Sequence, residues 1–596
     1  MSAYRDMLCG EPRAEQAGRE LTLSGWVGGR RDHGGLVFID LRDRSGIVQL
    51  VLDPERTPAG HALAQALRLE CVVRARGALV PRSAATRNDQ IPTGAVELAV
   101  DELELLSSSE VLPFQLDDEN VDESLRIRHR YLDLRRPRMQ ELQGIRTRAV
   151  RSIRRFLDER GFLDLETPTM TRATPEGARD FVIPFRLEPG AFYALPQSPQ
   201  LYKQLLMCGG FDRYYQIARC WRDEAQRADR ALEFTQLDLE MSFVEREDVL
   251  TLTEQLMAEV WRDAGHEVEL PFPRMPYGEA LARYGSDKPD LRYGLEIGDV
   301  GEAVAGSQFG VFAGAVAAGG VVRCLSVPGA ASALSRKDFD ELAEFAKEWG
   351  GKGLAYLIFE ADGSVRSPIA KFLSEDEIAA IRAASGAENG SVAFIAADSQ
   401  AVVERVLGAL RPHLARRFEL IPEGLWRFLF VVDFPLFKEN EEGGGWTAEH
   451  HPFTAPKREH EELLESDPGA VASEAYDLVL NGLEMASGSI RINRAELQTR
   501  VLDVIGIAPD VAEERFGFLL RALRFGAPPH GGIAPGIDRI AMQLGGTDNL
   551  REVVAFPKLG GGADPLTGAP APLPPEILAE LGLTVSRPAP GKPAAG

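Results

Sequence analysis

An arginine and a glutamate two residues apart begin a polar loop between two apolar-rich segments. The loop covers residues 222–230, and the flanking segments are Tyr214–Cys220 and Phe234–Phe243. The second segment alternates apolar with polar residues, which is typical of half-buried β-strands. In such a strand pair Arg222 can bind a phosphate through two hydrogen bonds, and Glu224 can accept a hydrogen bond from an exocyclic amine. The spacing alone fits a surface hairpin with ion pairs at least as well.

Two further segments contain residue types that could act in a site. His450 and His451 are adjacent, but no third ligand follows at a spacing typical of zinc, so we exclude a zinc site. Arg539 follows a glycine-rich segment, residues 530–536, which predicts a sharp turn from a strand into a helix. Its guanidinium is therefore expected to project from that turn.

The composition is that of an ordinary globular protein of several domains. The chain has 596 residues, of which 44% are apolar and 26% are charged, and this length suggests about four domains. No apolar run reaches the ~18 residues needed to span a membrane, and the N-terminus lacks the apolar core of a signal peptide. The five cysteines are scattered without a CxxC pair, which indicates a reducing cytoplasm rather than a disulfide framework.

The charge distribution is compatible with a nucleic-acid partner although the total charge argues against one. The formal net charge is −23, which argues against a nucleic-acid binder. Residues 126–155, however, contain 11 arginines and only two acidic residues. A basic segment of this kind can contact nucleic-acid phosphates, and it can equally form a solvated surface.

Residues 1–107 have the pattern of an all-β domain. The expected strands are Leu21–Val27, Leu36–Leu41, Ile47–Leu52, Cys71–Val80 and Val96–Leu106, and a helix is expected at Ala59–Leu69. Five strands with a helix between the third and fourth are typical of an OB-fold β-barrel. Such barrels bind single-stranded nucleic acid through aromatic and basic side chains. Phe38 could stack on a base or fill the barrel core, and the pattern alone favours the core.

The rest of the chain is predicted to mix helices and strands. Residues 140–160 have helical periodicity that ends at Gly161. From 287 to 420 glycine, alanine and valine dominate, and strands alternate with helices, which indicates a separate inserted α+β domain. The expected strands there are Val321–Leu325, Leu354–Phe359 and Val392–Ala397, and the expected helices are Lys337–Trp349, Glu375–Ala384 and Ser399–Ala415. A buried strand within 428–437 resumes the main domain.

Three segments resemble the three motifs of the class II aminoacyl-tRNA synthetases, and the whole chain resembles the bacterial aspartyl-tRNA synthetases. A long helix followed by a strand and Pro168 is similar to motif 1, residues 213–243 are similar to motif 2, and residues 526–546 are similar to motif 3. The segments occur in the family's order. The resemblance implies a multidomain α+β fold with an N-terminal OB-fold β-barrel, an antiparallel-sheet catalytic domain and an inserted α+β domain.

The same resemblance implies where the domains begin and end. The boundaries are an anticodon-binding barrel at 1–107, a hinge at 108–138, a catalytic domain at 139–286 and 421–576, an insertion at 287–420 and a C-terminal tail at 577–596. In this family motif 1 forms the interface of a homodimer, so a homodimer is expected. The sequence does not indicate what the inserted domain does.

The resemblance assigns an ATP site to motifs 2 and 3 and to the strands between them. Arg222 would hold the α-phosphate, and Arg539 would contact the adenine and the γ-phosphate. Asp477 and Glu484 would hold Mg²⁺, the expected cofactor, because carboxylates beside phosphates suit that ion. The expected ATP-binding residues are Arg222, Glu224, Arg230, Phe234, Glu484 and Arg539, and Arg222 and Arg539 would be catalytic.

The resemblance also assigns an L-aspartate pocket. Lys203 and Arg491 would hold the side-chain carboxylate, and Asp238 would hold the ammonium group. The full expected set is Glu176, Ser198, Gln200, Lys203, Arg222, Asp238, His450 and Arg491. Residues 486–488 read Ala-Ser-Gly where the family usually has a run of glycines, which predicts a slightly narrower site.

The barrel would contact the anticodon through Arg31, His33, Phe38, Gln49 and Glu97. Here the resemblance favours stacking by Phe38 over a place in the core. His33 stands where many enzymes restricted to tRNA-Asp have leucine. An imidazole can donate or accept a hydrogen bond and so would accommodate either pyrimidine at the third anticodon position. This predicts that tRNA-Asn is also charged, for a partner amidotransferase, unless His33 only fills the loop surface.

The sequence therefore predicts a cytoplasmic aspartate–tRNA ligase that uses ATP, forms an aspartyl-adenylate and has no membrane segment. A strictly discriminating enzyme is one alternative. An asparaginyl or lysyl relative would share the motifs, but a lysyl pocket would need carboxylates in place of Lys203 and Arg491. An asparagine synthetase of this fold would lack the barrel. A non-catalytic RNA-binding paralogue would have lost Arg222, Glu484 or Arg539, and all three are present.

Overall fold

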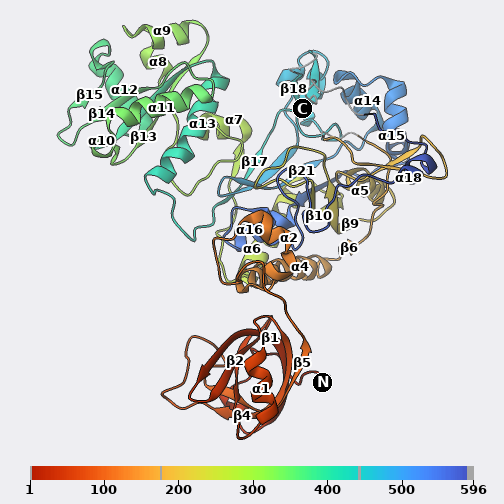
Figure 1. Cartoon of the computed structure of the whole chain (residues 1–596). Helices are drawn as coiled ribbons and strands as arrows, with labels where there is room; N and C mark the ends of the chain where they lie inside the picture. Colours follow the sequence, from red (N-terminus) through yellow and green to blue (C-terminus); the bar gives the residue numbers. More distant parts are fainter. Residues whose placement is uncertain (1–2, 175–177, 441–443, 587–596) are drawn as a thin grey trace. The chain divides into compact units, whose positions relative to one another are not determined.

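The structure is a computed structural model that describes residues 3–174, 178–440 and 444–586. Five N-terminal strands form a closed barrel in the order β1-β2-β3-β5-β4 (Figure 1). The barrel elements are β1 (Glu20–His33), β2 (Leu36–Asp43), β3 (Gly46–Leu52), α1 (Pro58–Ala66), β4 (Val72–Pro81) and β5 (Val96–Ser107). Each expected strand overlaps an observed one, so the predicted OB-fold barrel is confirmed.

Alternation along β2 separates the barrel core from its outer surface. Val37, Ile39 and Leu41 are buried in the core, whereas Phe38 points to the other face and is only half-buried. The interpretation of Phe38 as a core residue is therefore wrong. The side chain lies on the outer surface, where Arg31 of β1 is its cross-strand neighbour.

The segment after the barrel contains two short helices and the start of a long one. These are α2 (Glu123–Arg128), α3 (Arg130–Asp133) and α4 (Pro137–Asp158). Residues Met1–Gly144 and Arg551–Ala571 form one compact unit, and Ile145–Leu550 with Pro572–Gly596 form the other. The division into six domains stays a prediction.

Three arginines of the basic segment pair with one buried carboxylate inside the first unit. The Asp133 carboxylate is fully buried and pairs with Arg126 at 2.9 Å, Arg130 at 2.5 Å and Arg136 at 3.4 Å. Arg130 also donates to the backbone oxygens of residues 551, 554 and 555. These arginines stabilise the fold, so contact with nucleic-acid phosphates stays a prediction only for the exposed ones.

An eight-stranded sheet forms the centre of the second unit. Its order is β11-β17-β20-β21-β22-β10-β9-β6, antiparallel except for the parallel pairs at its two edges. The strands are β6 (Leu163–Asp164), β9 (Arg213–Trp221), β10 (Glu233–Ser242), β11 (Arg274–Pro276), β17 (Phe428–Val432), β20 (Ala475–Leu480), β21 (Leu483–Ile490) and β22 (His530–Pro535). The predicted antiparallel catalytic sheet is therefore confirmed.

Helices α4, α6 (Arg246–Asp263) and α16 (Ile537–Leu544) pack against this sheet (Figure 1). Their apolar side chains form one core with Leu237 and Leu239 of β10. Because strand side chains alternate between faces, Asp238 and Glu240 on β10 point to the opposite face. A second cluster joins α5 (Gln200–Cys208), α14 (Ala495–Val504) and α15 (Pro509–Leu523).

The inserted region contains its own five-stranded sheet in the order β12-β13-β16-β14-β15. Its strands are β12 (Gly298–Asp299), β13 (Val321–Val327), β14 (Ala355–Phe359), β15 (Val365–Arg366) and β16 (Val392–Asp398). Its helices, and α7 that leads into it, are α7 (Tyr277–Tyr284), α8 (Gly301–Val304), α9 (Gly310–Ala317), α10 (Ala330–Ala333), α11 (Arg336–Glu348), α12 (Glu375–Ser385) and α13 (Gln400–Arg417). All six elements expected here are present.

Six further short strands and α-helices lie in the described chain. They are β7 (Val182–Pro184), β8 (Phe192–Ala194), β18 (Phe437–Glu439), β19 (Trp446–Ala448), α17 (Leu550–Val553) and α18 (Pro575–Glu580). Helix α18 includes the first residues of the segment expected as a tail, and residues 587–596 lie outside the described residues. None of the described helices is both long and apolar enough to cross a membrane.

Candidate active site

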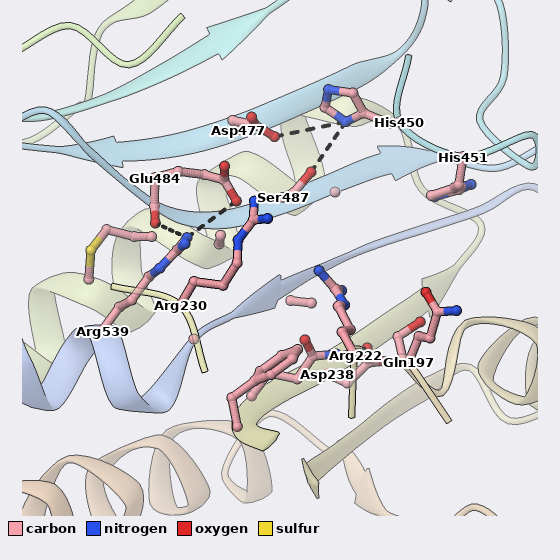
Figure 2. Close-up of a pocket in the computed structure, with 18 of the residues that line it drawn as sticks. Gln197, Arg222, Arg230, Asp238, His450, His451, Asp477, Glu484, Ser487 and Arg539 are labelled. Atoms are coloured by element: carbon pink, nitrogen blue, oxygen red, sulfur yellow. Dashed lines mark hydrogen bonds and ion pairs between the residues drawn. The ribbon is translucent and has the colours of Figure 1, made fainter. Parts of the chain in front are cut away.

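A cavity of about 650 Å³ in the second unit brings together most of the predicted site residues (Figure 2). It is lined by side chains of α5, β10, β21 and α16 and of the loop after β9. The predicted residues in the lining are Ser198, Gln200, Lys203, Arg222, Glu224, Arg230, Phe234, Asp238, His450, Asp477, Glu484, Arg491 and Arg539. Glu176 lies outside the described residues.

Two cations and two carboxylates are buried together at one end of the cavity. The Lys203 ammonium lies 3.1 Å from an Asp238 oxygen and 3.4 Å from Glu240 Oε2. The Arg491 guanidinium donates to both Glu240 oxygens, at 2.9 and 3.1 Å. All four residues are at most 3% exposed. Glu240 was not predicted, and it holds both cations that were expected to bind a substrate carboxylate.

The alternation of side chains along β10 places both carboxylates in this buried cluster. Asp238 and Glu240 are two residues apart, so they share the face of the sheet opposite to Leu237 and Leu239. Burial raises the pKa of Asp238, and the neighbouring Lys203 only partly opposes this effect. Burial has the same tendency at Glu240, but Arg491 and Lys203 outweigh it and lower the pKa of that carboxyl.

A chain of hydrogen bonds lies beside this cluster. Gln200 donates to the Gln204 side-chain oxygen at 3.2 Å, and Gln204 Nε2 lies 3.2 Å from His530 Nε2. His530 Nδ1 lies 2.8 Å from the Pro528 carbonyl oxygen, to which it donates. Burial lowers the pKa of His530, so the ring is neutral and Nε2 accepts from Gln204. The chain thereby fixes the orientation of Gln200, a predicted substrate contact.

The adjacent histidines have different partners. His450 Nδ1 lies 3.3 Å from the Ser487 hydroxyl and 4.0 Å from Asp477 Oδ1 (Figure 2). His451 Nε2 accepts from Arg491 at 2.9 Å. Burial, reinforced by the Arg491 charge, lowers the pKa of His451 well below its ordinary value, so this ring is neutral. His451, which was not predicted, is thus the histidine in contact with the buried charge cluster.

Arg222 and Phe234, which both belong to the segment that resembles motif 2, lie together in the cavity lining. The Arg222 guanidinium carbon is 5.0 Å from the centre of the Phe234 ring, a cation–π distance. Its Nε is buried and has no hydrogen-bond partner among the described residues. An unsatisfied buried donor of this kind is suited to an anionic ligand. Beside it Glu224 pairs with Arg230 at 2.8 Å.

Arg539 and Glu484 meet at the other side of the cavity. Arg539 Nη1 donates to the Glu484 carbonyl oxygen at 2.5 Å and lies 3.4 Å from its carboxylate (Figure 2). A bulge in the pairing of β20 with β21 lies next to Glu484 and helps to aim this side chain. Burial acts against ionisation of Glu484, but the charges of Arg539 and Lys288 outweigh it and lower the pKa.

Asp477 and Glu484 have the chemistry expected of a Mg²⁺ site completed by phosphates. Asp477 Oδ1 is buried and without a hydrogen-bond partner in the described part of the chain. Burial raises the pKa of Asp477 to about 7, as expected for a carboxylate that lacks a nearby cation. No group of three or more His, Cys, Asp or Glu side chains among the described residues could hold a metal alone. The pair therefore fits an ion that also needs ligand oxygens.

Both residues that replace the expected glycines border the cavity. Ala486 also packs in the core with Leu478 and Ile533, whereas the Ser487 hydroxyl contacts His450. The serine hydroxyl gives His450 a hydrogen-bond partner that glycine would not provide.

On the barrel the expected anticodon residues form a connected polar row. Arg31 Nη2 donates to Asp40 at 3.0 Å and to Gln49 at 3.3 Å, and Gln49 donates to Glu97 at 2.9 Å. His33 lies exposed at the end of β1. The row lies on the outer surface, where a stacking face is also available from Phe38.

A family model described as tRNA synthetases class II (D, K and N) matches residues 122–560. The chain belongs to this family. A second model, described as an OB-fold nucleic acid binding domain, matches residues 21–106. The two matches cover the catalytic sheet and the barrel, so the family assignment agrees with the observed fold.

Similar proteins cover nearly the full length of this class II synthetase. It is 51% identical over 582 residues to Aspartate--tRNA(Asp/Asn) ligase of Moorella thermoacetica, covering 97% of this chain and 96% of the relative. It is 49% identical over 586 residues to Aspartate--tRNA ligase of Bacillus licheniformis, covering 98% and 99%. The asparaginyl-tRNA synthetase from Pyrococcus horikoshii complexed with asparaginyl-adenylate shares the fold, with a TM-score of 0.57, 18% identity and coverage of 92% and 97%.

Three residues that line or adjoin the cavity of this synthetase were missed by sequence reasoning. Glu240 could have been found, because it follows Asp238 at strand spacing on the same predicted face. His451 could not be chosen over His450 from an adjacent pair. Lys288 belongs to a segment assigned to the inserted domain, and nothing in its local sequence indicates that it reaches the cavity.

Proposed function

We propose that this class II synthetase attaches L-aspartate to tRNA-Asp in two steps. In the first step the aspartate α-carboxylate attacks the α-phosphorus of ATP, which gives aspartyl-adenylate and pyrophosphate. In the second step the terminal ribose hydroxyl of the tRNA attacks the activated carbonyl and AMP leaves. The near-full-length similarity to proteins named as aspartate–tRNA ligases supports this proposal.

The buried charge cluster is the single observation that carries the choice of aspartate. Without substrate, Lys203 pairs with Asp238. Besides the α-carboxylate that reacts, aspartate brings a side-chain carboxylate and an ammonium group. It can therefore replace this pair by two new ones, Lys203 with the substrate side-chain carboxylate and Asp238 with the substrate ammonium. Asparagine has no side-chain carboxylate, so once its ammonium engages Asp238, the buried Lys203 would keep only Glu240, which it shares with Arg491. Two buried cations would then share one carboxylate, which is costly.

Positioning and charge stabilisation account for the chemistry without a protein nucleophile. The unsatisfied Nε of Arg222 is suited to the α-phosphate as its charge changes. Arg539 is suited to the nucleotide at the other side of the cavity, and Phe234 offers a face for the adenine. Asp477 and Glu484 would hold Mg²⁺, which when bound neutralises phosphate charge.

Aspartate-dependent exchange of pyrophosphate into ATP tests the first step without tRNA. The wild-type protein should exchange with L-aspartate and not with L-asparagine at comparable concentrations. Arg222→Ala should slow exchange by about 100-fold or more, the loss typical of one contact to a developing charge. Arg219→Ala is the matched control, because Arg219 is exposed, pairs with Glu233 and lies outside the cavity. Equal exchange with both amino acids would refute the choice of aspartate.

A second candidate is that the enzyme also charges tRNA-Asn, and several similar relatives are named for both tRNAs. His33 is exposed at the end of β1, beside the row of polar residues expected to contact the anticodon. Purified tRNA-Asp and tRNA-Asn should both be charged by the wild type, and His33→Leu should shift the ratio toward tRNA-Asp. Rejection of tRNA-Asn by more than about a thousandfold in the wild type would refute this candidate.

The remaining proposals concern the oligomeric state, the protein partner and the cellular location. We propose a homodimer, in which α4 and the edge strand β6 belong to the interface. Exposed apolar side chains near that edge support it, among them Leu163 and Met170. An enzyme that charges tRNA-Asn would act with an amidotransferase that converts the product, in the cytoplasm. Sedimentation equilibrium of the purified protein tests the dimer directly.

A further inference from the structure

We propose that Lys288 binds the terminal phosphates of ATP, and hence the pyrophosphate that leaves in the first step. This inference rests on the proposed function only for the identity of the reaction. Lys288 lies between α7 and the inserted sheet, far in sequence from the three motifs, yet it lines the cavity together with Arg222, Glu484 and Arg539.

The ammonium group is held loosely and by charge alone. Lys288 Nζ lies 3.6 Å from Glu484 Oε2 and 3.8 Å from Asp287, both beyond a good hydrogen-bond distance. The side chain is 42% exposed, so the ammonium can move at little cost to reach a ligand in the cavity. Arg539 lies 3.4 Å from the other Glu484 oxygen. One carboxylate is therefore flanked by two cations, an arrangement suited to several negative phosphate oxygens arriving together.

The backbone that carries Lys288 is held firmly on both sides. Gly285 ends α7 with φ +65°, and a side chain there would overlap Glu404 and Gly408 of α13. On the other side, two residues after Lys288, Asp290 lies against Gly482 in the turn between β20 and β21. The backbone at Lys288 is thus held in place, whereas its ammonium group can move.

A buried arginine of the inserted region completes this support. Arg411 of α13 is 2% exposed and donates to the carbonyl oxygens of Asp290, Tyr293, Gly294 and Leu295, at 2.8 to 3.2 Å. Through these bonds α13 fixes the segment that carries Lys288. The inserted region therefore contributes a residue to the nucleotide site, which gives it a role in the first step.

The proposal separates the two steps of the reaction. Pyrophosphate has left before tRNA reacts, so Lys288 should matter for adenylate formation and its reversal but not for transfer from a preformed adenylate. A residue that only stabilised the pocket would affect both steps. Lysine to arginine keeps the charge, so it should restore much of the function.

The test compares Lys288→Met, Lys288→Arg and the wild type. Titration calorimetry with inorganic pyrophosphate and Mg²⁺ should show binding about 10- to 100-fold weaker in Lys288→Met, the loss typical of one charged hydrogen bond, with recovery in Lys288→Arg. Exchange should fall by a similar factor, through a higher KM for pyrophosphate. Transfer from isolated enzyme-bound aspartyl-adenylate to tRNA should stay within about twofold of wild type.

Lys337→Met is the matched control, because Lys337 is 86% exposed in the inserted region and outside the cavity. Unchanged pyrophosphate binding in Lys288→Met would overturn the proposal, as would an equal loss in the transfer step. The calorimetry does not depend on the amino acid, so it decides the role of Lys288 even if aspartate-dependent exchange fails. Absence of exchange in the wild type would instead count against the proposed function.

Discussion

At the scale of single residues, Glu240 is the carboxylate that holds both cations of the buried charge cluster. It accepts two hydrogen bonds from Arg491 and pairs with Lys203, while fully buried. Removing one member of a buried ion network leaves the others without compensation for the loss of water. The shape and stability of this buried cluster therefore depend on Glu240, which contacts no nucleotide in the proposed mechanism.

Glu240→Ala should lower the free energy of unfolding by about 3–5 kcal/mol, because it leaves two cations buried with one carboxylate. Urea denaturation followed by fluorescence measures this loss. Glu240→Gln, which keeps the shape, should cost less. Glu348→Ala is the control, since Glu348 is exposed at the end of α11. If Glu240→Ala unfolds at the same urea concentration as the wild type and Glu348→Ala, the ion network does not stabilise the fold.

His451 should make stability depend on pH. Its pKa is lowered in the folded state by burial and by Arg491, so the unfolded chain binds a proton that the folded one does not. The contribution is fully present above the unfolded pKa and is lost as pH falls below it, by up to about 1.4 kcal/mol per pH unit. His451→Gln should therefore lose less stability than the wild type between pH 7.5 and 5.5.

Melting temperatures of both proteins across this pH range provide the check. Other buried groups titrate in the same range, Asp477 among them, so the difference between variant and wild type is the informative quantity. A difference that does not change with pH would contradict the role given to His451.

At the scale of elements, β22 must approach β10 closely for the pocket to form. Gly532 pairs with Glu240, and a Cβ at position 532 would overlap the Leu239 carbonyl oxygen and the Glu240 carboxylate. The strand pair therefore tolerates only glycine at this point. In the sequence this requirement appears only as one glycine in the segment that resembles motif 3. The resemblance includes Gly532 but does not explain why glycine is needed there.

Gly532→Ala should destabilise the protein by about 1–3 kcal/mol, the usual cost of overpacking, and should slow pyrophosphate exchange by displacing Glu240. Thermal unfolding and exchange rates measure both effects. The control is Gly278→Ala in α7, where no atom lies near the added methyl group and alanine favours a helix. Normal exchange in a correctly folded Gly532→Ala protein would show that Glu240 tolerates displacement.

Sequence reasoning succeeded where the determining contacts are local. The barrel strands and the helices of the inserted region follow from alternation and periodicity within a few residues. The site depended on resemblance, because its pairs join distant positions, as with Glu240 and Arg491, which are 251 residues apart. The basic segment shows the same limit, since its arginines could not be assigned to buried pairs without knowing that Asp133 is fully buried.

At the scale of the whole molecule, the ATP and aspartate candidates lie outside the barrel. The cavity lining begins at Ala178, whereas the polar row of Arg31, Gln49 and Glu97 belongs to the barrel. Activation and anticodon contact are therefore expected to be separable. The barrel has its own closed sheet and its own core, so its removal is expected to leave the catalytic sheet intact.

Deletion of residues 1–107 should leave aspartate-dependent exchange within a few-fold of wild type and reduce charging of tRNA-Asp by about 100-fold or more, because the anticodon contacts are lost. Exchange and charging assays on the same preparation measure both. A truncated protein that charges tRNA normally would show that the barrel does not contact the anticodon.

The bonds of Arg130 have a consequence for the order in which the molecule is made. Its guanidinium donates to the backbone oxygens of Arg551, Val554 and Ala555, more than 400 residues later in the chain. On the ribosome the barrel can close as soon as its five strands have emerged. The segment that follows it cannot complete the surroundings of its buried charges until residues 551–555 have been translated. A nascent chain that stops short of residue 551 therefore has a finished barrel joined to an unfinished connector.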